Sequence, residues 1–524
     1  MKIIVERLNR ISNWQKILLL ILLIFSIEIF SFSAFFLPTF ALSIFILLNL
    51  SFLLLAIKKI EFAIFVIFSE LIVSSMGHMF FLDLGGFRLS IRMTFWLILL
   101  LVFCFKFIIQ FYKSAKDSVY WQRIRDFKFL KVFCLLALFI TLALFRGLLL
   151  QNSFSSVFND FNSWLFFILI IPVLAVIDLK KEKTAIYLKN ILLASFIYLS
   201  LKTLILLGIF SHNLEIASSI YTWLRGTLMA EITVNSFWSR IFMQSQIFSG
   251  LAFFLVFVLA QKNIINLNLI GDGKEKVKAF FNKDNLVLMI LAGLFLSTLI
   301  LSFSRSFWLA LVIVIFFSLI LFWIYFGFKN TLKSAFFLVI SFALALFLIY
   351  FVSILPISSS DNLSFNKGLS ERISQDSKEP ALASRWSLLP VLWSEIKTAP
   401  ILGKGFGFEL SYISSDPRVL ERNPSGEYKT SAFEWGYLDI WLKMGVFGLF
   451  VYFLLLTKII FTGFKEKLNH SGIFWAFSLA LMFLAILNFF TPYLNHPLGI
   501  GLIIISTCII QENEVYLKKN KSNI

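Results

Sequence analysis

The sequence predicts an all-α, polytopic integral membrane protein with about 14 transmembrane helices and one long extracytoplasmic loop that contains an amphipathic helix. Three observations predict this fold class. Of the 524 residues, 59% are hydrophobic and only 15% are charged, whereas soluble domains carry about 25% charged residues. Apolar runs of roughly 20 residues, the length that crosses the hydrocarbon core, recur through most of the chain. One polar stretch, residues 356–433, interrupts them.

The apolar runs give the predicted spans in order along the chain. The first follows a basic segment and is too long for the apolar region of a cleaved signal peptide, so we expect it to remain in the protein. The predicted spans are 17–37, 40–57, 62–82, 92–111, 129–149, 161–177, 186–210, 241–261, 286–302, 306–328, 334–355, 436–460, 471–491 and 494–510. The three cysteines lie within or at the ends of these spans, so no disulfide framework is implied.

The charge distribution predicts the orientation of the spans. If the N-terminus is cytoplasmic, the lysine-rich segments all fall on the cytoplasmic side, as the positive-inside rule requires. Both termini are then cytoplasmic and residues 356–433 lie outside. The net charge of +18 is therefore mainly a signal of topology and not of nucleic-acid binding.

The short outer loops differ from the inner ones in the type of cation that they contain. Their only cations are arginines: Arg88, Arg92, Arg146, Arg225, Arg240 and Arg305. The arginine side chain offers a rigid fork of donors that suits phosphate oxygens. This contrast favours phosphate chemistry at the outer face, and six unrelated interfacial anchors are the alternative.

We divide the chain into four regions on this basis. They are an N-terminal transmembrane region (1–235), a second transmembrane region (236–355), the extracytoplasmic loop (356–433) and a C-terminal transmembrane region (434–524).

The polar loop contains a predicted amphipathic helix that starts at Ser384. Its apolar stripe carries Arg385 in the middle, so we expect the helix to lie against the membrane domain or the lipid, with this arginine pointing inward. The stripe consists of Leu388, Leu389, Leu392 and Ile396, flanked by Trp386 and Trp393. Pro400 ends the helix. The following GKGFG segment around Lys404 is interpreted as a sharp reversal, with a phosphate loop as the alternative, because it lacks the spacing and the preceding strand of a nucleotide-binding loop.

Two further arginines stand out at the outer side. Arg305 lies in a turn of a few residues between two apolar spans, and arginine near apolar depth is costly unless it has a partner. A ligand role is therefore predicted, with an interfacial snorkel as the alternative. Arg240 precedes the eighth predicted span on the same side, and anchor and ligand roles both remain open for it.

Several carboxylates lie within or next to the spans. Glu434 stands where the chain re-enters the membrane, between two aromatic residues, and is a candidate general base; a solvated loop carboxylate is the alternative. Asp439 and Lys443 have the i, i+4 spacing of an ion pair on a helix. Glu28 and Glu70 lie in the middle of spans. We expect these two to pair with cations such as Lys106 or Lys202 and to pin helices together, and a proton path in a transporter is the alternative.

Four segments follow one another between roughly residues 236 and 455. They are Arg240 before a span, SRS around Arg305, ASRW with P-x-x-G-x-G-x-G from Arg385 to Gly407, and the segment that starts at Glu434. Their order resembles the O-antigen ligase and O-antigen polymerase family of bacterial envelope enzymes. The ligases have a histidine, an amide or serine residue, nine residues, glycine, two residues and a small residue. Here Glu434 and Trp435 replace the first two positions, which favours a polymerase or a different acceptor.

The resemblance implies a multi-helix fold shared with peptidoglycan polymerases. It also implies a glycosyltransferase that moves glycan chains from undecaprenyl pyrophosphate to a glycan or lipid acceptor outside the cytoplasmic membrane, with no cofactor and no metal. Arg240, Arg305 and Arg385 are then expected to bind the pyrophosphate, and Glu434 to act as the catalytic base. Arg225 and Lys404 are additional candidate donor contacts. Membrane lipid and other polysaccharide assembly proteins are expected partners.

A lipid-linked oligosaccharide flippase or another transporter is the competing class. It accounts for many spans and for charges inside them, and the two mid-span carboxylates favour it slightly. It does not require a long outer loop with an arginine-bearing helix, so the sequence favours glycan transfer.

Overall fold

The computed structural model describes residues 12–83, 85, 88–114, 119–235, 238–266, 280–355, 380–415, 417–465 and 468–521. The first part of the predicted outer loop, 356–379, lies outside these residues.

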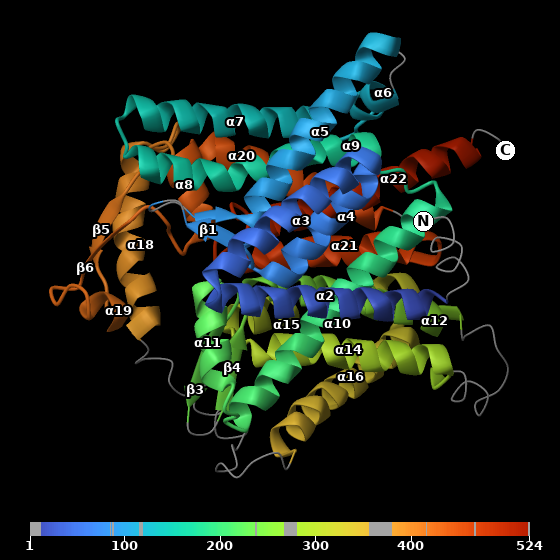
Figure 1. The fold of residues 1–524 in the computed structure, drawn as a ribbon. Coiled ribbons are helices and arrows are strands. Elements are labelled where there is room, and N and C mark those ends of the chain that lie inside the picture. The colour runs from blue at the N-terminus through green and yellow to red at the C-terminus, as the bar shows by residue number, and fades with distance from the viewer. Residues whose placement is uncertain are drawn as a thin grey trace.

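The described chain folds into a helical bundle with three short β-hairpins (Figure 1). The helices are α2 (Asn13–Phe36), α3 (Pro38–Lys58), α4 (Ile60–Ser74), α5 (Ile91–Ser114), α6 (Val119–Arg125), α7 (Leu130–Leu149), α8 (Phe154–Trp164), η2 (Leu165–Leu169), α9 (Ile170–Val176), α10 (Glu182–Ser211), α11 (Ala217–Gly226), η3 (Gln244–Gln246), α12 (Ile247–Asn266), α14 (Lys283–Leu301), α15 (Arg305–Phe326), α16 (Phe328–Ile354), α18 (Pro380–Thr398), α19 (Pro417–Leu420), α20 (Gly436–Phe464), α21 (Leu468–Leu487) and α22 (Pro497–Lys521). The antiparallel hairpins pair β1 (Phe81–Asp83) with β2 (Arg88–Ser90), β3 (Glu231–Asn235) with β4 (Trp238–Phe242), and β5 (Leu410–Ile413) with β6 (Glu427–Thr430).

The polytopic helical class is confirmed, but the number of spans is not. Among the described residues, 11 helical segments are long and apolar enough to cross a membrane. The other three predicted spans correspond to shorter helices, namely α4 and the apolar parts of α21 and α22. The predicted span 62–82 was too long, because α4 ends at Ser74 and Ser75 has a φ of 56° that a helix does not allow. The predicted span 161–177 begins earlier, at Phe154, and contains the 3₁₀ segment η2.

Burial separates a central set of helices from a peripheral set. The spans of α10, α12 and α14 are 72%, 78% and 61% buried, whereas those of α2, α3 and α16 are each 22% buried. The peripheral helices carry exposed leucine, isoleucine and phenylalanine side chains along their length. A helix that is apolar on all sides but exposed needs a lipid environment, so the peripheral helices are the ones that face the bilayer.

The predicted pairing of the mid-span carboxylates is confirmed. Lys202 Nζ lies 2.5 Å from Glu28 Oε1, and Tyr198 donates to the other carboxylate oxygen at 2.8 Å, which joins α2 to α10. Arg92 Nε lies 2.8 Å from Glu70 Oε2, which joins α5 to α4. Lys106, the other cation considered, instead donates to carbonyls at the end of α3.

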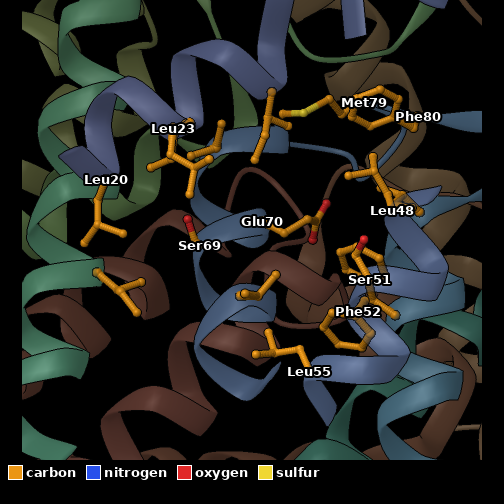
Figure 2. A pocket seen from close by; sticks show the side chains of 17 residues that line it. Leu20, Leu23, Leu48, Ser51, Phe52, Leu55, Ser69, Glu70, Met79 and Phe80 are labelled. Carbon is orange, nitrogen blue, oxygen red and sulfur yellow. The ribbon is translucent and has the colours of Figure 1, made fainter. Parts of the chain in front are cut away.

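Glu70 also borders an apolar cavity of about 280 Å³ between α2, α3, α4 and α5 (Figure 2). Leucine, isoleucine and phenylalanine side chains form most of its wall, including Leu20, Leu23 and Phe52. An unpaired carboxylate in such surroundings would be costly. The bidentate contact of Glu70 with Arg92 therefore explains how this charge is tolerated.

The two ends of the bundle differ. The start of α2 and the end of α22 lie at one end, and the three hairpins lie toward the other, together with α18 and α19 (Figure 1). Both ends of the described chain therefore lie on one side of the bundle, and the polar loop lies on the opposite side. The cytoplasmic assignment of the termini stays a prediction.

The described part of the polar loop is folded and packs against the membrane domain. As predicted, α18 is amphipathic, and Leu388, Leu392 and Ile396 are buried. They pack with residues of β5, with Phe433 and with Leu442 of α20. The helix spans Pro380–Thr398, so it begins before the predicted Ser384 and ends shortly before Pro400.

Candidate active site

Arg385 and Glu434, which are 49 residues apart, form an ion pair. Arg385 Nε lies 2.5 Å from Glu434 Oε2. The indole of Trp435 donates to the Arg385 carbonyl at 3.0 Å, and the rings of Trp386 and Trp435 lie 5.5 Å apart. The contact joins the start of the amphipathic helix to the point where the chain re-enters the bundle.

This contact gives Glu434 a cation that its sequence neighbours do not supply, because the packing of α18 on α20 brings Arg385 to it. The exposure of the pair corrects the expectation that Arg385 points inward. Neither side chain is enclosed by apolar groups, since 35% of Arg385 and 50% of Glu434 are exposed. Arg385 therefore does not point into the buried stripe but lies at its edge, where water reaches both charges.

The GKGFG segment is a sharp reversal, as interpreted from the sequence. Gly403, Gly405 and Gly407 have φ values of 70°, 76° and 74°, which glycine adopts without steric cost. All five backbone amides from Gly403 to Gly407 donate hydrogen bonds to acceptors within the protein. These amides are therefore not available for a phosphate group, which argues against the phosphate-loop alternative.

The same glycines allow the segment to lie directly on its neighbours. A Cβ atom on Gly405 would come closer than 3.0 Å to the backbone of Gly147 at the end of α7. Lys404 donates its backbone amide to the carbonyl of Leu442 in α20. Its side chain lies 3.1 Å from Glu395, so Lys404 is a surface ion-pair residue and makes no contact with Arg385 or Glu434.

Helix α20 is broken at Gly445, where the loop meets it. Gly445 has φ 72° and ψ 175° inside the helix, and a Cβ atom there would collide with the carbonyl group of Ile401. The amide of Val446 donates to the carbonyl of Pro400 at 2.9 Å. Gly445 is the glycine of the ligase-like spacing. Its positive φ and the close carbonyl group of Ile401 explain why this position requires glycine.

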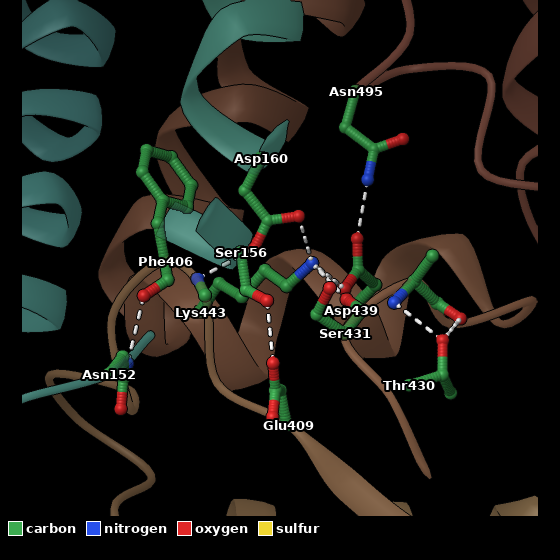
Figure 3. A network of polar contacts seen from close by, with 12 residues as sticks. Asn152, Ser156, Asp160, Phe406, Glu409, Thr430, Ser431, Asp439, Lys443 and Asn495 are labelled. Atoms are coloured by element: carbon green, nitrogen blue, oxygen red, sulfur yellow. Dashed lines mark hydrogen bonds and ion pairs between the residues drawn. The ribbon is translucent and has the colours of Figure 1, made fainter. Parts of the chain in front are cut away.

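A buried network fixes the N-terminal end of α20 (Figure 3). Lys443 Nζ lies 2.8 Å from Asp439 Oδ1, which confirms the predicted i, i+4 pair, and also 2.8 Å from Asp160 Oδ1 of α8. It donates in addition to the carbonyl of Ser431 at 2.8 Å, three residues before Glu434. The amide group of Asn495 donates to Asp439. The network therefore holds the segment that carries Glu434.

Sequence reasoning missed Asp160 and Asn495 in this network. Asp160 lies directly before the predicted span 161–177. Asp160 lies on α8, an amphipathic helix, and this local pattern is what could have drawn attention to it. Its partner Lys443 is 283 residues away in the sequence, so no local spacing indicates the pair.

Arg240 and Arg305 lie at neighbouring positions in the structure. Arg240 Nε donates to the carbonyl of Ser302 at 3.1 Å, in the turn that ends with Arg305. The Arg240 guanidinium also lies over the ring of Phe242, 5.0 Å from its centroid. Phe242 in turn contacts Phe307, two residues after Arg305.

The connection between α21 and α22, residues 488–496, links the two groups of residues. Tyr493 contacts Phe307 on the side of Arg240 and Arg305. Phe490 contacts Trp435 on the side of Arg385 and Glu434. One connection therefore borders both groups. Convergence of all three arginines on one ligand stays a prediction.

The remaining arginines of the predicted outer loops have varied contacts. Arg92 is buried in its pair with Glu70, and Arg146 donates to the carbonyl of Gly403 at 2.6 Å. Arg88 lies 3.3 Å from Asp83. These three serve the structure, so the phosphate interpretation does not extend to the whole set. Arg225 forms an exposed pair with Glu231 at 3.5 Å and borders a polar pocket next to β4.

A comparison with models of protein families identifies a match in the second half of the chain. Residues 290–453 match the family model described as O-Antigen ligase. No curated protein matches the chain. The matched region includes Arg305, Arg385, Glu434 and Gly445. The match bears out the resemblance predicted from the sequence: residues 290–453 of the chain are similar to the O-antigen ligase family.

Proposed function

We propose that this protein transfers a glycan from a polyprenyl-pyrophosphate donor to a glycan or lipid acceptor at the outer face of the cytoplasmic membrane, as a surface polysaccharide polymerase or ligase. The family match supports glycan transfer in general. The contact between Arg385 and Glu434 carries the more specific proposal, because it brings a phosphate-binding type of side chain to a candidate base.

The donor is already activated, so the protein has two tasks. It must stabilise the negative charge that develops on the departing pyrophosphate, and it must accept the proton of the attacking hydroxyl group. Fixed guanidinium groups perform the first task by electrostatic stabilisation. Arg240 and Arg305 are suited to it because the hydrogen bond from Arg240 to Ser302 orients one guanidinium at the turn that carries the other.

The ion pair suggests how Arg385 and Glu434 take part. An exposed pair of this kind contributes only about 0–1 kcal/mol, so exchanging its carboxylate for a pyrophosphate costs little. Arg385 would turn to the donor and release Glu434. The acceptor oxygen then bonds to the anomeric carbon, the bond from that carbon to the pyrophosphate oxygen breaks, and the Glu434 carboxylate takes the acceptor proton. Polyprenyl pyrophosphate leaves with the electron pair.

The segment from Glu434 to Gly448 bears on the acceptor. Glu434 and Trp435 occupy the places of the histidine and the amide or serine residue of the ligases. A carboxylate and an indole present different hydrogen-bonding groups to an incoming hydroxyl. We therefore favour polymerisation, or attachment to an acceptor other than lipid A core.

The two mid-span carboxylates, which slightly favoured a transporter, do not require a transport role. Glu28 and Glu70 both form ion pairs with buried cations. Each pair joins two helices, so a structural role is sufficient to explain both carboxylates.

The proposal is tested with the purified protein in proteoliposomes and a purified lipid-linked repeat, in buffer with a chelator. Longer lipid-linked or transferred chains should form without added nucleotide sugar. Arg305→Ala should reduce turnover roughly ten- to a hundredfold, since a charge-assisted contact contributes about 1.5–3 kcal/mol. Arg305→Lys should recover part of this loss because it keeps the charge but not the fork.

Arg422→Ala is the matched control, since Arg422 is an exposed arginine of the same outer region. It should transfer glycan at the parental rate. Movement of unmodified donor across the bilayer with no new glycosidic bond would contradict the proposal and support the transporter class.

A further inference from the structure

A polar pocket lies next to the arginines assigned to the pyrophosphate. It has a volume of about 350 Å³ and lies where the end of α4, the end of α11 and the β3–β4 hairpin meet. Its wall includes Ser75, Arg225, Leu228, Glu231, Phe242 and Gln244. None of these elements belongs to the region matched by the family model.

The hairpin connects this pocket to Arg240. In its register, Glu231 lies opposite Phe242, and Thr233 lies opposite Arg240. Paired residues point to the same face of a hairpin, and faces alternate along each strand. Glu231, Phe242 and Arg240 therefore share one face, and the Arg240 guanidinium lies 5.0 Å from the centre of the Phe242 ring. The pocket therefore adjoins Arg240, which is proposed to bind the pyrophosphate.

The polar groups of the wall suit a neutral, hydroxyl-rich ligand. Arg225 offers donors and Glu231 offers acceptors, and the two side chains lie 3.5 Å apart and are about half exposed. Among the described residues, the Gln244 side-chain amide makes no hydrogen bond, so it has both a donor and an acceptor to offer. Phe242 adds an apolar surface. A second phosphate group fits less well, because the Glu231 carboxylate would repel it.

Two residues of the wall have unusual backbone conformations. Ser75 has a φ of 56° and Leu228 a φ of 55°, although residues other than glycine rarely adopt positive φ values. The surroundings hold Ser75 in place: Arg92 donates to its carbonyl at 2.8 Å, and its hydroxyl accepts the amide of Gln244 at 3.1 Å. Strained residues that are fixed in this way are common at ligand sites, and here both of them shape one pocket.

We propose that this pocket binds a sugar ring of the donor glycan close to its pyrophosphate. The inference rests on the proposed role of Arg240 at the pyrophosphate. A sugar that follows the pyrophosphate along the hairpin face would meet the Phe242 ring first, and then Glu231, Arg225 and Gln244. The pocket would thus help to select the repeat unit, whereas Arg240 recognises the part that all such donors share.

The test measures the affinity of the purified full chain for two probes. One is undecaprenyl pyrophosphate without sugar, and the other is the undecaprenyl-pyrophosphate-linked glycan purified from the host strain. Glu231→Gln and Gln244→Ala should each weaken binding of the glycan-bearing probe about fivefold or more, and binding of the bare probe should stay at the parental value. Arg240→Gln should weaken binding of both probes.

Glu215→Gln is the control for Glu231→Gln, because Glu215 is an exposed carboxylate just before α11; it should bind both probes as the parental chain does. Melting temperatures are compared so that only folded variants are interpreted. Unchanged binding of the glycan-bearing probe in both pocket variants, or an equal loss for the two probes, would overturn the sugar pocket alone. A parental chain that binds neither probe would overturn the proposed function, and this inference with it.

Discussion

Replacing Lys443 by methionine should destabilise the N-terminal end of α20 strongly. Lys443 is 4% exposed and lies 2.8 Å from both Asp160 and Asp439. Methionine fills a similar volume but removes the positive charge and leaves two buried carboxylates next to each other. Breaking a buried ion pair by removing one partner costs about 3–5 kcal/mol.

Lys429→Met is the matched comparison. Lys429 also lies 2.8 Å from a carboxylate, that of Glu409, but it is 66% exposed. Exposed pairs contribute about 0.2–1 kcal/mol. Residue type and ion-pair distance are thus the same in the two variants, which differ in burial and in that Lys443 contacts two carboxylates and Lys429 contacts that of Glu409.

Thermal unfolding of the purified variants in one detergent measures the difference. Lys443→Met should melt several degrees below the parental chain, and Lys429→Met close to it. Hydrogen exchange should also increase around Ser431, because Lys443 holds its carbonyl. The double variant Asp160→Asn with Lys443→Met should recover part of the loss, since one of the two carboxylates is then neutral. Equal melting temperatures for the two lysine variants would refute the reasoning.

Three further predictions concern the loop and the topology. Gly405→Ala should reduce the yield of folded protein, since its Cβ would collide with the backbone of Gly147. Gly327→Ala has a similar φ of 79° and open space around its Cβ, so it should lose only the cost of the backbone conformation, about 1–3 kcal/mol; equal yields and melting temperatures for the two variants would contradict this. The Lys429 and Ser156 side chains hold the pKa of Glu409 below its ordinary value of 4.5, so its stabilising contribution is present above that pH and lost as the pH falls through the folded-state pKa. Glu409→Gln should therefore melt lower than the parental chain at neutral pH and converge with it as the pH falls below the folded-state pKa, and a constant difference would argue against the pair. In a cysteine-free background, Ser425→Cys should react with an impermeant maleimide in cells whose outer membrane has been opened, and Lys183→Cys should not; the reverse pattern would invert the topology.

The sequence predicted the features that depend on one segment at a time. Apolar runs located a helix for every predicted span, because crossing a hydrocarbon layer requires length and hydrophobicity that a single segment shows. Helix ends were less predictable. The end of α4 depends on the positive φ of Ser75, which is held by Arg92 and Gln244 from other elements.

The candidate site was predictable only in its separate parts. Arg385 and Glu434 were both identified, but their ion pair depends on how α18 packs on α20, and no local pattern reports that packing. Glycine spacing likewise indicated Gly445 but not the carbonyl of Ile401 that requires it. The polar pocket was missed because it combines residues of α4, α11 and the β3–β4 hairpin, and only Arg225 among them had been considered.

The central claim, that Glu434 takes the proton of the acceptor, is tested most directly by Glu434→Gln. The measurement is the rate of chain formation from purified lipid-linked repeat, with donor binding measured in parallel. Glutamine keeps the size and polarity of the side chain but cannot accept the proton, so the rate should fall about 10²–10⁴-fold while the donor still binds. Glu434→His should be more active than Glu434→Gln, and Glu427→Gln, a change at an exposed carboxylate of β6, should be fully active. Chain formation by Glu434→Gln at the parental rate would contradict the claim.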